Sequence, residues 1–351
     1  MDRFLVAPSR IGLVVAAATA AAVLSACSHA GSPAASAPPS HSSSPSTAAS
    51  PAKAAAATPP TIVGVTTAGA LVILNPTTGV VERTLVPSGV VGDEVSLAPN
   101  GMIYFAGYHN CASSITAIPL SGGTPTFVAD GVDPAVSPDG TKLAYSLASP
   151  CGPTVGVLQI RTLSSGATIN LPDSPSGQGD GLFPAISHLS WAADSRYLAV
   201  SIPAIQENSG WALNIVDTAQ AQYYAYGAGV TPVPVTGNPD AQASYFMEGV
   251  YTPNGDLFVS RACCAGAPVQ NTSRLMWEVT TSGAFVHQIA IGYPNLDHNS
   301  LDVSPDGQWL LYVAGKPSYV AGTPSSGTLY VSEGGATPHE LTTGIAAAAW
   351  S

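Results

Sequence analysis

A short turn motif recurs along this 351-residue chain, and each copy lies between two apolar segments. Four of the five copies contain Pro-Asn-Gly or Pro-Asp-Gly. Proline presets the first backbone angle of a tight turn, and glycine accepts the positive φ that such a turn requires. Each copy therefore predicts a hairpin between two strands. The copies are Ala98–Gly101, Ser137–Gly140, Ala192–Ser195, Thr252–Gly255 and Ser304–Gly307.

The spacing of these motifs predicts the architecture. Successive copies lie 39, 55, 60 and 52 residues apart, and a third and a weaker fourth apolar segment follow in most repeats. Four strands in a repeat of about 40 to 50 residues is typical of a β-propeller blade. The segment after Thr61 starts in the middle of a repeat, and Ala347–Ser351 supplies the missing first strand. We therefore expect residues 61–351 to form an all-β, six-bladed propeller, closed by pairing of its N- and C-terminal strands, which hides both sheet edges.

Two copies carry a resemblance to a known family. Val136–Gly140 followed by Leu143–Tyr145, and Val303–Gly307 followed by Leu311 and Tyr312, resemble the repeats of TolB-type six-bladed propellers, which read Trp-Ser-Pro-Asp-Gly and then Leu-Ala-Tyr or Leu-Ala-Phe. The resemblance spans residues 61–351 and implies a fold, because propellers serve many functions. The small N-terminal domain of TolB has no counterpart here, so the resemblance does not extend to TolB's own envelope system.

Residues 1–27 have the features of a secretory signal. Arg3 and Arg10 precede an apolar stretch from Ile11 to Leu24, which is shorter than the ~20 residues of a membrane span. The following Leu24-Ser25-Ala26-Cys27 resembles the lipobox of bacterial lipoproteins. The resemblance implies that the Cys27 thiol takes a diacylglycerol and becomes the new N-terminus. The alternative is an ordinary signal peptide that happens to precede a cysteine.

Residues 28–60 predict a disordered tether. All of them are Ser, Ala, Pro, Thr or Gly except His29, His41 and Lys53, so the segment has no side chains with which to bury a core. A lipid on Cys27 and this tether would hold the propeller at the outer face of the cytoplasmic membrane. The Ala-rich composition is typical of a GC-rich genome, such as that of an actinobacterium.

The charge balance limits the choice of partners. Asp and Glu number 21 against 10 Lys and Arg, and charged residues make up 9% of the chain. Nucleic acid is excluded as a partner, because phosphate binding needs clustered basic residues. We expect a monomer whose partner is an extracytoplasmic protein, a peptide or a cell-wall glycan.

Four cysteines follow Cys27, and an oxidising compartment favours their pairing. All four fall in expected connections between second and third strands, on one face of the propeller. Cys111 and Cys151 occupy equivalent loops of adjacent blades, so a disulfide between them is expected. Cys263 and Cys264 are neighbours that predict a strained vicinal disulfide. Two free thiols, pairs made across the face, or zinc binding are the alternatives.

Aligning the repeats on the turn proline predicts a polar ring. The residues two places before the proline position are large and apolar, as packing between blades requires. The residues five places before it should encircle the mouth of the central channel on the cysteine-loop face. They are Glu94, Asp133, His188, Glu248, Ser300 and Ala347, of which the first five are candidate ligand-binding residues.

Three functions fit these residues. In the first, the propeller is a binding or scaffold module with no cofactor. In the second, Glu94, Asp133 and Glu248 hold Ca²⁺ or Mg²⁺, because hard oxygen ligands suit these cations; this arrangement resembles that of lactonases of the gluconolactonase and paraoxonase group. In the third, the vicinal cysteines and Arg261 indicate a quinone-dependent dehydrogenase. The chain has no Gly-x-Ser-x-Gly, His-Glu-x-x-His or phosphate-binding glycine loop, so no catalytic residue is assigned and we favour the binding module.

Overall fold

All the regular secondary structure in the described part of the computed structural model is β-strand. The structure describes residues 60–109, 112–147, 157–171, 187–203, 211–225, 245–262, 274–279, 285–290, 297–315, 327–333 and 336–350. The predicted signal peptide, nearly all of the tether and the five cysteines lie outside these residues. Within them, no helix is long and apolar enough to cross a membrane. The expectation of an all-β fold is confirmed.

The described strands form five antiparallel sheets, four with four strands and one with seven. The seven-stranded sheet has the order β20-β21-β22-β23-β1-β2-β3. Its long strand β23 pairs with β22 over His339–Ile345 and with β1 over Ile345–Trp350. The sheet thus contains two groups of four strands that share β23. We number the six groups of four strands as units 1 to 6 in chain order, and the shared strand belongs to units 6 and 1.

The first three units contain the strands up to β11. Unit 1 contains the end of β23 with β1 (Ile62–Thr66), β2 (Leu71–Leu74) and β3 (Val81–Val86). Unit 2 contains β4 (Val90–Leu97), β5 (Met102–His109), β6 (Ala112–Pro119) and β7 (Thr126–Asp130). Unit 3 contains β8 (Val132–Val136), β9 (Lys142–Leu147), β10 (Val157–Thr162) and β11 (Thr168–Asn170).

The remaining strands follow the same order. Unit 4 contains β12 (Ser187–Trp191), β13 (Tyr197–Pro203), β14 (Trp211–Asp217) and β15 (Gln222–Ala225). Unit 5 contains β16 (Tyr245–Tyr251), β17 (Leu257–Ala262), β18 (Arg274–Val279) and β19 (Phe285–Ala290). Unit 6 contains β20 (Asp297–Val303), β21 (Trp309–Gly315), β22 (Gly327–Glu333) and the start of β23 (His339–Trp350).

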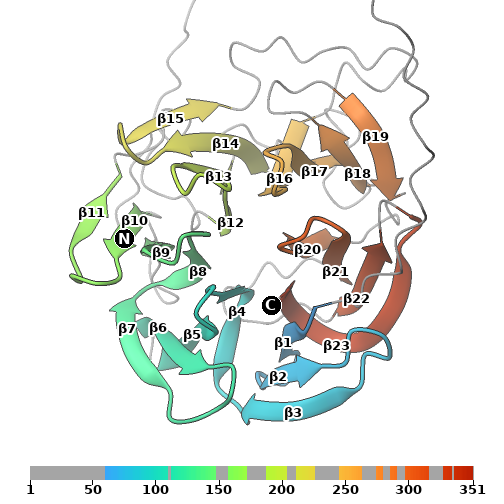
Figure 1. The fold of residues 1–351 in the computed structure, drawn as a ribbon, viewed down its shortest axis with the longest axis horizontal. Helices are drawn as coiled ribbons and strands as arrows, with labels where there is room; N and C mark the ends of the chain where they lie inside the picture. The colour runs from blue at the N-terminus through green and yellow to red at the C-terminus, as the bar shows by residue number, and fades with distance from the viewer. Residues whose placement is uncertain are drawn as a thin grey trace, which may run out of the picture. The chain divides into compact units, whose positions relative to one another are not determined.

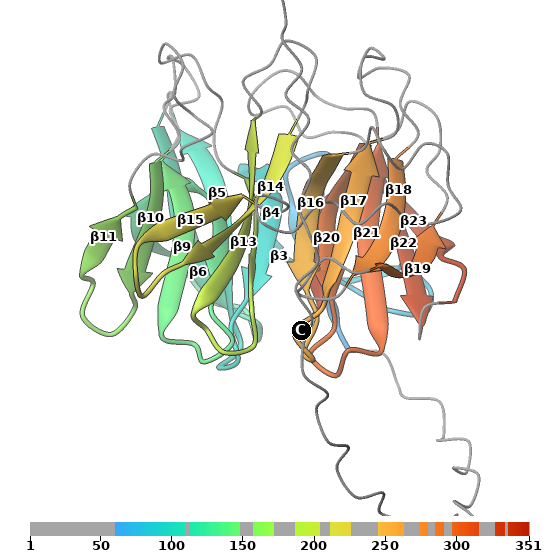
Figure 2. The same ribbon diagram turned by 90° about the horizontal axis from the view of Figure 1, so that it is seen from above.

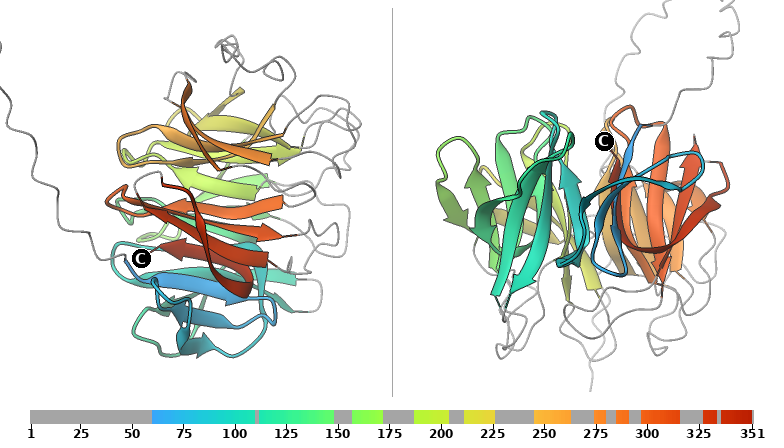
Figure 3. Two further views of the ribbon diagram at one scale, coloured as in Figure 1. Left: turned by 90° about the vertical axis from the view of Figure 1, so that its right-hand side faces the viewer. Right: turned by 90° about the horizontal axis from the view of Figure 1, so that it is seen from below.

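The first strand of every unit lies toward a common centre. Figure 1 shows β4, β8, β12, β16 and β20 innermost and the fourth strands outermost. Each inner strand contacts the next, and the end of β23 contacts both β20 and β4. The strands run roughly parallel to the central axis, as the side views show (Figures 2 and 3).

All five predicted turns form. In each, the amide of the fourth residue donates to the carbonyl of the first at 2.8–2.9 Å, and the fourth residue has a positive φ. Glycine fills that place in four turns. Ser195 fills it in the fifth with a φ of 56°, a conformation that costs a residue with a side chain about 1–2 kcal/mol.

The turn side chains reinforce this geometry. The Ser304 hydroxyl accepts a hydrogen bond from the Trp309 amide at 2.9 Å and donates to Asp306. This bond from Ser304 is the main cause that lowers the pKa of Asp306 below its ordinary value. Ser137 makes the equivalent contacts with Lys142 and Asp139. Each turn therefore fixes the hairpin that leads from an inner strand to the second strand of its unit.

Apolar side chains fill the spaces between neighbouring units. Each buried cluster in the described residues draws its members from two consecutive units, and one joins unit 6 to unit 1 through Leu311, Val331, Ile62 and Trp350. The residues two places before the turn proline lie in these clusters, as predicted. They are Leu97, Val136, Trp191, Tyr251, Val303 and Trp350.

We predict that Ser304→Ala lowers the free energy of unfolding by about 1–2 kcal/mol, because the Trp309 amide loses its side-chain acceptor. The midpoint of urea denaturation measures the effect. Ser304→Thr is the matched control, because Thr252 fills the same place in the fourth turn, where its hydroxyl donates to the Asn254 side chain and to the Asp256 carbonyl. Equal midpoints for the alanine variant and the unmodified protein would contradict this role.

Candidate functional site

A cavity of about 730 Å³ lies at the centre of the units. All six inner strand segments, including the end of β23, contribute to its wall. The described residues of the wall include no Lys or Arg. The lining extends from the level of Glu94, His188 and Ser300 along the inner strands to the turn residues Pro99, Pro138, Pro253 and Pro305.

A β-bulge interrupts every inner strand near the predicted ring positions. The pairing register between first and second strands shifts there in all units. Three ring residues take a left-handed backbone at the bulge: Asp133 (φ 53°), His188 (φ 53°) and Ser300 (φ 51°). Bulges re-aim side chains and are common beside functional sites, and strained backbone of this kind also gathers there.

The structure brings half of the predicted ring residues to the cavity. Glu94, His188 and Ser300 line it, and they come from units 2, 4 and 6. Asp133 is buried but is not part of the lining. Ala347 is also buried outside the lining. Glu248 belongs to β16, and its side chain lies outside the described residues.

Glu94 links two of these three strands across the cavity. Its Oε1 atom accepts a hydrogen bond from the Leu189 amide at 3.1 Å and lies 3.5 Å from Nδ1 of His188. Both side chains are largely enclosed, at 10% and 15% exposure. Because β4 belongs to unit 2 and β12 to unit 4, this contact joins two units that are not neighbours in the chain. The strand β20 contacts both β4 and β12, so the three strands of alternate units approach one another at this level.

A second set of polar side chains lies two residues further along the same three strands. Ser96 Oγ accepts from the Val136 amide at 3.0 Å, and Ser190 Oγ accepts from the Tyr251 amide at 2.9 Å. Asp302 Oδ2 accepts from the Trp350 amide at 2.7 Å. Each bond joins the inner strand of an even-numbered unit to that of the next unit. The equivalent residues of the odd-numbered units, Ala135, Val250 and Ala349, have no polar side-chain atom.

Asp302 is the one carboxylate in this second set. Its Oδ1 atom also accepts from the Val303 amide at 2.8 Å. Asp302 is partly exposed and lines the cavity. Burial, only partly offset by the two amide hydrogen bonds, raises the pKa of Asp302 to about 7. The alignment of the repeats did not select this residue, because the position three before the proline is polar only in alternate repeats, where it is Ser96, Ser190 and Asp302.

The described residues contain no group of three or more His, Cys, Asp or Glu side chains that could hold a metal ion. Of the predicted metal ligands, Glu94 and Asp133 do not share the cavity wall, and the Glu248 side chain lies outside the described residues. The metal site therefore stays a prediction. The predicted pairings of Cys111 with Cys151 and of Cys263 with Cys264 also lie outside the described residues.

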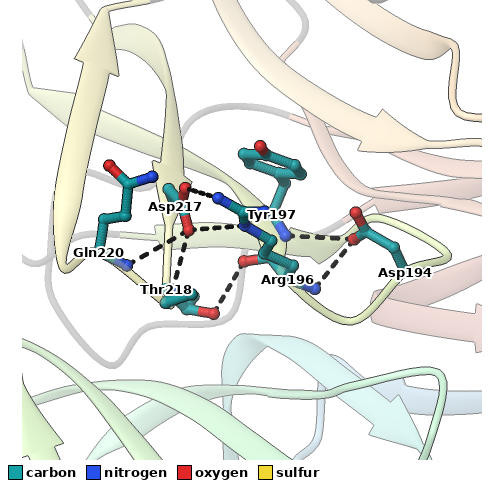
Figure 4. A network of polar contacts seen from close by, with 7 residues as sticks. Asp194, Arg196, Tyr197, Asp217, Thr218 and Gln220 are labelled. Atoms are coloured by element: carbon teal, nitrogen blue, oxygen red, sulfur yellow. Dashed lines mark hydrogen bonds and ion pairs between the residues drawn. The ribbon is translucent and has the colours of Figure 1, made fainter.

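A separate polar network ties the second and third strands of unit 4 (Figure 4). The Arg196 guanidinium donates to Asp217 through Nε at 3.0 Å and a terminal nitrogen at 2.6 Å. Asp217, only 2% exposed, also accepts from the Ala219 amide at 3.0 Å. The hydrogen bond from Arg196 is the main cause that lowers the pKa of Asp217. These residues do not line the cavity, so we assign them a structural role.

Four-stranded antiparallel units arranged around a central cavity define the class of this fold as a β-propeller. The solved structures that it resembles include TolB from Acinetobacter baumannii, with a TM-score of 0.56 and 14% identity over 83% of this chain and 65% of that one. Another is a putative TolB from Agrobacterium tumefaciens, with a TM-score of 0.53 and 12% identity over 82% of this chain and 91% of that one. This chain thus spans about two thirds of the Acinetobacter protein.

At such low identity the likeness shows the fold alone. It confirms the predicted resemblance to TolB-like propellers at the level of architecture. No protein-family model and no curated protein sequence matches the chain.

We predict that Asp217→Asn lowers the melting temperature most at neutral pH and least in acid. Because the pKa of Asp217 is lower in the folded state than in the unfolded chain, its stabilising effect is present above the unfolded value of about 3.9 and disappears as pH falls through the folded value. Thermal unfolding followed by circular dichroism between pH 3 and pH 7 measures this. The control Arg196→Lys keeps the charge but loses the two-pronged geometry. A difference in melting temperature that does not change with pH would contradict the assignment.

Proposed function

We propose that this chain is a membrane-anchored, extracytoplasmic lipoprotein whose propeller binds a segment of a partner in its central cavity. The lipid would be attached at Cys27, and residues 28–60 would be the tether. The propeller would have six blades, units 1 to 6, closed by the pairing of β23 with β1. The register between these two strands and the apolar cluster between units 6 and 1 support this closure.

The observation that carries the proposal is the cavity itself. Its volume of about 730 Å³ lies in the range of pockets that hold ligands, ~300–1,000 Å³. The wall is mainly apolar with a few enclosed polar groups, among them Glu94, His188 and Asp302, and this combination is typical of sites that combine affinity with orientation. A short extended segment of a protein fits such a space better than a folded domain.

The electrostatics of the wall favour a ligand without negative charge. Two carboxylates, Glu94 and Asp302, and one imidazole face the cavity, and no Lys or Arg is among the described lining residues. An acidic ligand would be repelled by Glu94 and by the ionised form of Asp302, with no basic side chain among the described lining residues to compensate. We therefore infer a neutral or basic segment as the ligand. A glycan fragment of the cell wall is the alternative occupant.

The lactonase-like hydrolase with Ca²⁺ or Mg²⁺ is the weaker candidate. It needs at least three oxygen ligands that converge, and the described residues supply no such group. The quinone-dependent dehydrogenase rests on Cys263, Cys264 and Arg261, whose side chains lie outside the described residues. Neither has an observation in the cavity that favours it over binding.

A photocrosslinking amino acid tests where a partner binds. Ala193 is exposed and lines the turn end of the cavity, whereas Phe127 is 66% exposed on the outer strand β7. We predict that the full chain carrying the crosslinker at residue 193 captures a partner in the native envelope, and that Glu94→Gln reduces this product several-fold. The same group at residue 127 is the control. Equal products from both positions would contradict binding in the cavity, and mass spectrometry of the product distinguishes a protein segment from a glycan.

We predict that Cys27→Ala moves the full-length protein from the membrane fraction to the soluble fraction. Stable anchoring needs two or more acyl chains, which only the modified cysteine would supply. Fractionation with immunoblotting and metabolic labelling with an alkyne fatty acid measure the change. Ser28→Ala is the neighbouring control and should leave both readouts unchanged. A lipid label that persists in the Cys27 variant would contradict the predicted lipidation site.

A further inference from the structure

The wall of the central cavity differs in exposure between its two ends. At the turn end, the four turn prolines that line the cavity are all exposed to solvent. At the other end of the lining, the side chains of Glu94 and His188 are only 10% and 15% exposed, and Ser300 is buried. The cavity is therefore open to solvent at the turns and becomes more enclosed toward the level of Glu94.

Contacts between alternate units narrow the enclosed end. Glu94 on β4 accepts a hydrogen bond from the Leu189 amide of β12 and lies 3.5 Å from Nδ1 of His188. The strand β20 contacts both β4 and β12. A ligand that enters from the turns therefore advances end first. A chain end or one long side chain suits such a path better than the middle of an extended segment.

The polar groups between the two ends include one charge that the fold does not require. Ser96, Ser190 and Asp302 occupy equivalent positions of the three even-numbered units, and all three line the cavity. Each accepts a hydrogen bond from a backbone amide of the next unit. A serine is sufficient for that bond, as two of the three positions show. The carboxyl group of Asp302 therefore adds a negative charge that the contact between units does not need.

The carboxyl group of Asp302 can be reached from the cavity. The residue is partly exposed and lines the wall. Its two hydrogen-bond donors are the amides of Val303 and Trp350, and each carboxylate oxygen can accept a further bond. Among the described residues, no basic side chain forms an ion pair with it. Burial raises its pKa to about 7, and a positive group beside it would favour the ionised form.

Aromatic side chains add a second feature that suits a positive charge. Trp191, Tyr251 and Trp350 line the cavity, and aromatic rings attract cations that lie over their faces. Trp350 is also the residue whose amide donates to Asp302. No Lys or Arg is among the described lining residues. The wall can thus stabilise a cation through a carboxylate and through aromatic rings, with no basic group to repel it.

We propose that the cavity receives a positively charged amino group of the partner, and that Asp302 is the residue that pairs with it. This proposal rests on the proposed function, in which the cavity binds a segment of a partner. The amino group enters at the exposed turns and reaches Asp302, and the mainly apolar wall surrounds the chain that follows it. Two sources supply such a group: the amino terminus of a protein and the side chain of lysine.

Random hexapeptides with amidated carboxyl ends and no Lys or Arg, in a free-amino form and an N-acetylated form, provide the test. Mass spectrometry quantifies the peptides that the full-length protein retains. We expect the unmodified protein to retain roughly ten-fold more of the free-amino form, because acetylation removes the charge that pairs with Asp302. The preference should disappear in Asp302→Asn and in Asp302→Ser, which copies the two natural serine positions.

Three further arms separate the explanations. Glu82→Gln removes an exposed carboxylate on the outer strand β3 and should leave the preference unchanged, so it controls for attraction to the acidic protein as a whole. Ala193→Trp obstructs the turn end and should lower the retention of both forms. Acetylated hexapeptides with one lysine distinguish the two sources, because they are retained only if a side-chain amino group is sufficient.

Equal retention of the two forms by the unmodified protein would overturn the proposal, and so would a preference that both Asp302 variants keep. If Ala193→Trp abolishes such equal retention, binding in the cavity stands without the amino group. Failure to retain any peptide would contradict both proposals. The comparison of the two peptide forms on the unmodified protein needs no variant, so it decides the question even if a variant folds poorly.

Discussion

The pairing of β23 with two partners is the interaction on which the other features depend. Its first half completes unit 6 against β22, and its second half supplies the inner strand of unit 1 against β1. Without the pairing of β23 with β1, the edge of β1 would be unpaired and the apolar cluster between units 6 and 1 would be partly exposed, and both are costly. With charged residues at only 9% of the chain, ion pairs contribute little. The main stabilising contacts are therefore the apolar clusters between units and the backbone pairing of β23 with its two neighbours.

The inner strands of the even-numbered and the odd-numbered units differ in the polar groups that they contribute to the contacts at the centre. The inner strands of units 2, 4 and 6 contribute Glu94, His188 and Asp302 to the wall of the cavity. Through Ser96, Ser190 and Asp302, the same strands accept hydrogen bonds from the inner strand of the next unit. Units 1, 3 and 5 have Ala349, Ala135 and Val250 at the equivalent position. The backbone amides of the residues that follow them donate the three hydrogen bonds. At this position the inner strands of the described units are therefore joined in three pairs. At the position three before the turn proline, the polar side chains therefore lie on one set of inner strands and apolar side chains on the other.

The repeat allowed the turns, the all-β class and the residues between units to be predicted from sequence. Pro-Asp-Gly and Pro-Asn-Gly impose the turn geometry locally. The large apolar residues two places before the proline avoid water by packing in the space between units. The site was only partly predictable. Alignment selected Glu94, His188 and Ser300, which line the cavity, but it gave the same weight to Asp133, which does not. It did not select Asp302, because only alternate repeats have a polar residue at that position, and the contact that each makes with the next unit is formed only in the assembled fold.

The double role of β23 also has a consequence for the order in which this chain can fold. The strands β1, β2 and β3 emerge early in synthesis, yet their inner partner is residues 345–350, which are made after all the other described strands. Units 2 to 5 each consist of consecutive strands and can pair from local contacts, which form quickly because short loops cost little entropy. Unit 1 must wait with the edge of β1 unpaired, and such an edge can recruit a strand from another molecule. The nascent chain is therefore most exposed to misassembly at its first strands, and it relies on its last ones to remove that risk.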